Sequence, residues 1–330
     1  MRNGIKYYSI LIGSFAAMEL LLNAAVNRGF DLPSRHPLYR NQWLVDQRIL
    51  SHREWRDFSR RLDVLLALTF VPLVSGVSHV LESDFNVNSN TIFGIGSGFA
   101  GLGGSAGSST PLGGAGGNGG SGGAFASITN YNAHSAGQSV NIQVGASDSW
   151  FDSTSVLLAK AASPTLGGQA SACVGSVKFS GGNGGVGGAG TDPINGGGGG
   201  GGGGAGGPSG AGNNGAAGSI PAHGAGASGD AGVTPANSNG TEFQVSPAYG
   251  SGGGGDGGDG GNMSGGFGGT PNGADGKSGG SYGAGGGGGG GGRGGAGTNG
   301  GNGGNAFQGL LGIQYSPASG PARSFGFIVG

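Results

Sequence analysis

The strongest constraint on this chain is a three-residue repeat of the form Gly-Gly-X. It occurs as GGAGGNGGSGG at 113–123, GGNGGVGGAG at 181–190, GGDGGDGGN at 254–262 and GGRGGAG at 291–297, with uninterrupted glycine at 196–204 and 285–292. Segments with so few side chains cannot form an ordinary hydrophobic core. A period of three matches the left-handed extended helix, which has three residues per turn and no internal hydrogen bonds. The repeat therefore predicts polyglycine II helices that pair sideways with one another.

Lateral pairing must be extensive for such helices to be ordered. Fixing one residue costs about 1–2 kcal/mol, with glycine at the upper end, and a net hydrogen bond returns about 0.5–1.5 kcal/mol. A single glycine helix is therefore a random coil, whereas a bundle anchored to a folded part approaches balance. Disorder is the alternative, but the regular repeat, the low charge and the interspersed strands favour order. Collagen is excluded because proline is scarce and the repeat is not strictly Gly-X-Y.

Composition divides the chain into four parts. Of its 89 glycines, four fall within 1–92 and 85 within 93–330, whereas 18 of its 31 charged residues fall within 1–92. The expected fold is mainly non-regular and β, with an N-terminal helical segment. The predicted parts are a helical docking or anchoring region at 1–92, a Gly/Ser-rich linker at 93–123, a small β-rich domain at 124–180, and a polyglycine II bundle with a closing C-terminal strand at 181–330.

The N-terminal region contains two apolar stretches, Tyr7–Val26 and Leu62–Leu81, separated by an arginine-rich segment. Each stretch is about long enough to span a bilayer as a helix. Three interpretations remain open: docking in a larger assembly, a two-helix membrane hairpin with the arginine loop inside, and a secretion signal. Glu19 and Asp63 weigh against membrane insertion because buried carboxylates are costly there.

Residues 124–180 alternate apolar and polar positions, which predicts short strands with turns between them. We expect one small core built from Trp150, Phe151, Val156, Leu157, Leu158, Val174, Val177 and Phe179. The apolar, β-prone C-terminal segment is suited to closing this sheet or joining a neighbouring chain.

The sequence contains no readable catalytic arrangement, so we expect no enzyme activity and no cofactor. A net charge of −1 gives no support for nucleic-acid binding. Cys173 is the only cysteine and cannot form an intrachain disulfide or a zinc site by itself. Asp256 and Asp259 lie one turn apart in GGDGGDGGN and are weak candidates for calcium, although the large apolar residue of the calcium repeat is missing.

Isolated aromatic residues are the candidates for contact with a receptor. They are Phe243, Tyr249, Phe267 and Tyr282, each in polar or glycine-rich surroundings. One interpretation is packing over neighbouring helices, and the other is contact with a receptor, for instance by stacking on a sugar. The loops Ile220–Tyr249 and Met263–Tyr282 would then present these side chains.

The segments GGNGGSGGAFASITNYN, AGQSVNIQVG, WFDSTSVLLAKAA and SGGNGG, followed by the glycine runs, resemble the glycine-rich domain of bacteriophage tail fibres and related bacterial surface proteins. The chain is also similar to phage tail-fibre tip adhesins, in which loops between glycine helices touch the host receptor. The resemblance covers about 113–315. It implies a virion structural protein, a homo-oligomer that joins other subunits through residues 1–92 and the C-terminal strand. The alternatives are a cellular surface or extracellular filament protein and an ice-binding face.

Overall fold

The computed structural model describes residues 68–108, 112–190, 194–222, 224–227, 229, 234–262, 272–295 and 297–318. They belong to the second of two compact units of the chain, which begins at Val64. Their strands are β1 (Thr69–Leu73), β2 (Ser78–Val80), β3 (Asn90–Ile95), β4 (Phe125–Thr129), β5 (Ser139–Gln143), β6 (Ser149–Phe151), β7 (Leu157–Ala159), β8 (Val177–Phe179) and β9 (Leu310–Tyr315), with a 3-10 turn, η1, at Ala170–Ala172.

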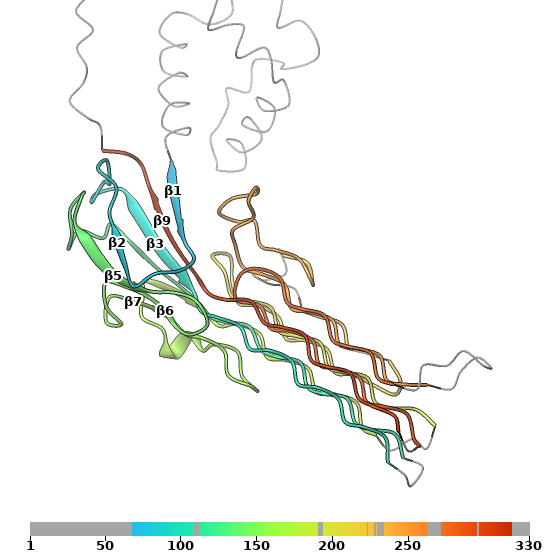
Figure 1. Ribbon diagram of the computed structural model, residues 1–330. Helices are drawn as coiled ribbons and strands as arrows, with labels where there is room; N and C mark the ends of the chain where they lie inside the picture. The colour runs from blue at the N-terminus through green and yellow to red at the C-terminus, as the bar shows by residue number, and fades with distance from the viewer. Residues whose placement is uncertain are drawn as a thin grey trace, which may run out of the picture. The chain divides into compact units, whose positions relative to one another are not determined.

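The strands form two antiparallel sheets, with the orders β1-β9-β3-β4-β8 and β2-β5-β6-β7 (Figure 1). The C-terminal strand β9 lies inside the larger sheet, between β1 and β3. Its register pairs Thr69 with Tyr315 on one side and Ile92 with Ile313 on the other. The last strand of the described chain is therefore an inner strand of the sheet, between two of the first three strands.

Strand alternation creates a separate apolar layer on each face of the larger sheet. Ile92 of β3 and Ile313 of β9 are buried together with residues of the smaller sheet, such as Ile142 and Phe151. This layer is the core of a β-sandwich. Phe93, the next residue of β3, points to the other face and belongs to a second cluster.

The glycine-rich segments form rods, meaning extended segments that hydrogen-bond sideways to a given neighbour at every third residue. The rod 196–206 is central. Its N–H groups donate in turn to three rods, for example Gly199 to Gly258 (2.8 Å), Gly200 to Gly117 (2.9 Å) and Gly201 to Ala216 (2.9 Å). Its carbonyls accept from three further rods. The six neighbours are 113–123, 181–190, 212–219, 224–227, 252–262 and 283–292.

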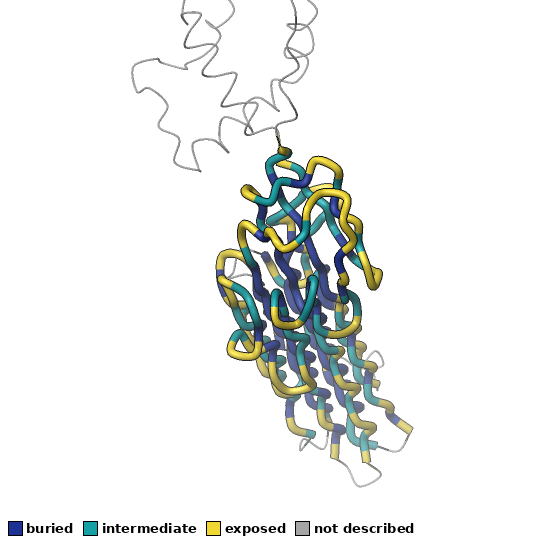
Figure 2. Tube along the Cα trace, turned by 90° about the vertical axis from the view of Figure 1, so that its left-hand side faces the viewer, coloured by how far each residue is buried: buried dark blue, intermediate teal, exposed yellow. Residues whose placement is uncertain are grey.

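The rod 283–292 is a second central element with the same pattern. Its N–H groups donate to the rods 196–206, 96–107 and 272–280, and its carbonyls accept from 113–123, 252–262 and 299–307. Each central rod is thus surrounded on six sides, and Figure 2 shows buried residues along the inner rods. The positive-φ glycines of the described residues lie outside the rods, except Gly283 at a rod end. A three-residue period with negative φ is the left-handed helix of polyglycine II.

Close approach of the rods explains why the inner positions are glycine. A Cβ added to Gly200 would lie 2.1 Å from the carbonyl oxygen of Gly185, and one added to Gly288 would lie 2.0 Å from that of Gly117. Both distances are far below van der Waals contact. Alanine therefore cannot replace these residues without separating the rods.

The β-rich part of the prediction is confirmed, but the predicted N-terminal helical segment is wrong where the structure describes it. Residues of Leu62–Leu81 form β1 and β2, and η1 is the only helical element in the described part of the chain. Pro72 and the β-branched residues around it suit an edge strand better than a helix. Tyr7–Val26 and the arginine-rich segment lie outside the described residues.

Two further predictions need correction. The predicted linker 93–123 contains the second half of β3 and two rods, 96–107 and 113–123, whose N–H groups pair with neighbouring rods. The predicted core residues also separate. Phe151 and Leu157 are buried, but Trp150 lies on the opposite face of β6 and Val177 is exposed. Phe179 packs in the second cluster.

Candidate functional site

The rods turn back at one end of the bundle, and their ends lie beside one another. Ser108 N–H donates to the Leu112 carbonyl (3.0 Å), and Ser219 N–H donates to the Ala222 carbonyl (2.8 Å). A lateral bond from Gly295 N–H to the Ser108 carbonyl (3.1 Å) joins two of these turns. This region, which we call the loop end, is distant from the sheets in Figure 1.

The described chain enters and leaves at the other end of the same unit. Thr69, the first residue of β1, pairs with Tyr315, the last residue of β9. The described chain therefore begins and ends on neighbouring strands of the larger sheet.

Side-chain acceptors complete the hydrogen bonding of the outer rods. The Asn118 side chain accepts from Gly187 N–H (2.9 Å), and the Asn272 side chain accepts from Asn299 N–H (2.9 Å). Asp275 accepts from Asn302 N–H in the same way (2.6 Å). An asparagine or aspartate on an outer rod thus replaces a missing neighbouring carbonyl. Sequence reasoning missed this role, although the recurrence of Asn, Asp and Ser at X is its signal.

Three of the four predicted receptor-contact aromatics pack together. Phe243 stacks on Phe93 with ring centroids 3.6 Å apart and an interplanar angle of 16°. Tyr249 stacks on Tyr282 at 5.7 Å and 9°. All three are half-buried against the second cluster, near the larger sheet. These contacts support the packing interpretation for Phe243, Tyr249 and Tyr282, and receptor contact stays a prediction; Phe267 lies outside the described residues.

Asp256 is used in pairing rods. Its carboxylate accepts from Gly226 N–H (2.8 Å), the Asn237 amide (2.7 Å) and the Lys277 ammonium (2.9 Å). Partial burial alone would raise the pKa of this carboxyl, but the three hydrogen bonds and the Lys277 charge hold it below its usual value. Within the described residues, no group of three or more His, Cys, Asp or Glu side chains is arranged to hold a metal ion. Asp256 and Asp259 therefore belong to no such group.

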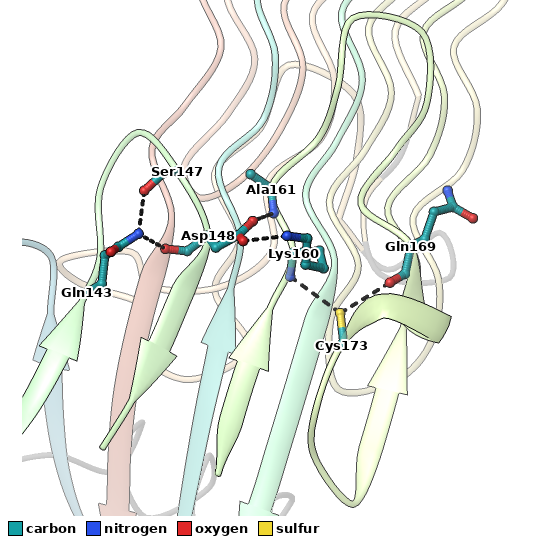
Figure 3. A network of polar contacts seen from close by, with 7 residues as sticks. All are labelled: Gln143, Ser147, Asp148, Lys160, Ala161, Gln169 and Cys173. Carbon is teal, nitrogen blue, oxygen red and sulfur yellow. Dashed lines mark hydrogen bonds and ion pairs between the residues drawn. The ribbon is translucent and has the colours of Figure 1, made fainter. Parts of the chain in front are cut away.

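A polar network joins the β5–β6 loop to the residues that follow β7 and to those on either side of η1 (Figure 3). Asp148 pairs with the Lys160 ammonium at 2.5 Å and accepts from Ala161 N–H at 2.8 Å. Cys173 is buried beside it, where Lys160 N–H donates to its Sγ at 3.3 Å. Burial raises the pKa of the Cys173 thiol. A buried thiol of this kind is unreactive, and the network is structural.

Two of the open hollows on the described surface lie beside the larger sheet and beside the bundle. One of about 390 Å³ lies near the two ends of the described chain and is lined mainly by polar residues such as Thr91, Thr129 and Gln314. The other, of about 510 Å³, lies beside Phe307 where the sandwich meets the bundle. Neither contains an arrangement of nucleophile, base and acid. Within the described residues, no helix is long and apolar enough to span a bilayer.

No protein-family model matches the chain, and no curated protein matches its sequence.

Proposed function

We propose that this protein is a structural and adhesive subunit of a virion, a tail-fibre or fibre-tip component that presents the loop end of its glycine bundle to a receptor on the host surface. The observation that carries the proposal is that the two ends of the described unit differ. The described chain begins at β1 and ends just after β9, which pair with each other, while the rods turn back at the far end.

A hydrogen-bonded bundle suits this task because it holds its turns in fixed relative positions. Loops on a rigid scaffold lose less conformational entropy on binding than loops on a flexible one. The loop end is also built from many short connections, so its sequence can vary without disturbing the central rods. Attachment to other subunits falls to the segments that continue from β1 and β9, and the full particle contains several copies.

Binding to host cells tests the loop-end assignment. In one variant, residues 263–271, which include Phe267, are replaced by a Gly/Ser segment of equal length. The matched control replaces residues 132–137, which connect β4 to β5 in the sandwich. We expect the first variant to lose most of its binding and the control to retain it. Equal binding by both variants, or no binding by the native protein, contradicts the assignment.

Immunogold labelling of the source material tests the virion assignment separately. Gold particles on fibres of a virus support it. Gold particles on the cell envelope alone favour the cellular surface protein instead.

A further inference from the structure

Phe307 is held rigidly at the end of the rod 299–307. Its N–H donates to the Ala284 carbonyl, and its carbonyl accepts from Gly98 N–H, both at 3.0 Å. The ring contacts the edge of Tyr282, with centroids 5.5 Å apart and an interplanar angle of 82°. Yet 37% of the residue remains exposed. A fixed, partly exposed aromatic ring loses little entropy when a ligand stacks on it.

The exposed ring borders the hollow of about 510 Å³. Pockets for small molecules commonly have volumes of about 300–1,000 Å³. Its lining consists of Ser97, Gly98, Ala146, Ala306, Phe307 and Gln308. All six are described residues, and none carries a charge, so the lining favours a neutral ligand over an ionic one.

The walls of the hollow are fixed by hydrogen bonds on both sides. Ser97 N–H donates to the Ser147 carbonyl (3.2 Å), which ties the start of the rod 96–107 to the β5–β6 loop. Gly309 N–H donates to the Gly145 carbonyl (2.7 Å), which ties the same loop to the residue before β9. The hollow is therefore formed before any ligand arrives.

The rim supplies hydrogen-bonding groups next to the apolar ring. Gln308 is exposed, and its side-chain amide makes only a long contact of 3.4 Å with the Val74 carbonyl. An amide has two donors and an acceptor, so most of its capacity remains for a ligand. Ser97 also lines the hollow but is buried, with 4% of the residue exposed. The combination suits a molecule with one apolar face and several hydroxyl groups.

We propose that this hollow is a carbohydrate-binding site, in which the C–H face of a sugar ring stacks on Phe307 and its hydroxyls bond to the exposed side-chain amide of Gln308. The site lies where the sandwich meets the bundle, and it does not depend on the loop-end proposal.

Saturation-transfer difference NMR with the native full-length chain tests this assignment. The probes are the methyl glycosides of glucose, galactose, mannose and N-acetylglucosamine at millimolar concentration. We expect transfer to the ring protons of at least one probe. Phe307→Ala should weaken its binding about tenfold, because the stacking surface is lost, whereas Phe307→Trp should retain it.

Two further variants separate loss of the site from loss of the fold. Ala146→Arg fills the hollow from an exposed loop, so it should abolish binding while leaving thermal unfolding unchanged. Leu102→Ala alters an exposed residue of the rod 96–107 that does not line the hollow, so binding should be unchanged. The proposal is overturned if the native protein shows no transfer to any probe, or if Phe307→Ala or Ala146→Arg binds like the native protein. Cell binding through the loop end is unaffected by either result.

Discussion

The amide N–H of Gly200 donates a 2.9 Å hydrogen bond to the carbonyl oxygen of Gly117. The same pairing recurs three residues later, from Gly203 to Gly120 at 2.8 Å, and again from Gly206 to Gly123 at 3.0 Å. The two rods therefore run parallel and in register over several turns. Backbone hydrogen bonds between such rods replace side-chain packing as the interior of the bundle.

Gly200→Ala tests whether this interior tolerates a side chain. The added Cβ would lie 2.1 Å from the Gly185 carbonyl oxygen, so we expect the free energy of unfolding to fall by at least about 2 kcal/mol. Gly103→Ala is the matched control, because the nearest atom to its Cβ would be 3.3 Å away and the position is exposed. It should change stability by no more than about 0.5–1 kcal/mol. Urea unfolding of both variants measures the difference, and equal effects would contradict close packing of the inner rods.

Asn118→Leu tests the role of side-chain acceptors on the outer rods. The substitution leaves Gly187 N–H without its 2.9 Å partner, so the variant should lose about 1–2 kcal/mol of stability. Asn118→Asp retains an acceptor and should lose less. Hydrogen exchange of the Gly187 amide measures the loss of this bond directly. The exchange rate should increase in the leucine variant, and an unchanged rate would exclude the acceptor role.

Phe243→Ala tests whether the aromatic cluster is structural. The substitution removes a ring that stacks on Phe93, and we expect a loss of about 2–3 kcal/mol because the ring is half-buried. Phe243→Leu should recover part of this loss. Thermal unfolding measures both variants. If the alanine variant keeps the native melting temperature but loses cell binding, Phe243 contacts the receptor and its ring is not needed for stability.

Tyr131 and Tyr315 predict how stability changes at alkaline pH. Burial raises the pKa of both phenols, and hydrogen bonds to Asp152 and Asp84 raise it further. In the unfolded chain a tyrosine loses its proton near pH 10. The stabilisation linked to the raised pKa values is therefore complete below about pH 10 and declines as the pH rises above it. Thermal unfolding between about pH 8 and 11 should show this decline, and it should be smaller in the double variant Tyr131→Phe/Tyr315→Phe. An identical pH profile in both proteins would contradict the linkage.

The sequence predicts the local features of this fold better than the contacts between segments that lie far apart in the chain. The Gly-Gly-X period directly reflects a bond to a neighbour at every third residue, so lateral pairing could be foreseen. Strand alternation around Phe151 was also readable, but Trp150 was assigned to the same core, although adjacent strand residues face opposite sides. Leu62–Leu81 was misinterpreted because its apolar length suited a helix, whereas Pro72 marked an edge strand.

Distant contacts could not be predicted because no local pattern encodes them. Nothing near Leu310–Tyr315 indicates that this segment lies between β1 and β3, since its partners are more than two hundred residues away. The packing of Phe243 on Phe93 likewise depends on how the loop after 234 returns to the sheet. The hollow at Phe307 combines parts of the β5–β6 loop and of two rods, and a single sequence window contains only one of them.

Hydrogen–deuterium exchange across 196–204 tests the central claim most directly, because this stretch is glycine alone and has no side chains that could protect it. If the rods pair as described, all of its amides are bonded to neighbouring rods and exchange slowly, with free energies of opening close to that of global unfolding. Exchange at the rate of an unstructured glycine peptide would show that the lateral hydrogen bonds do not form, and would contradict the account.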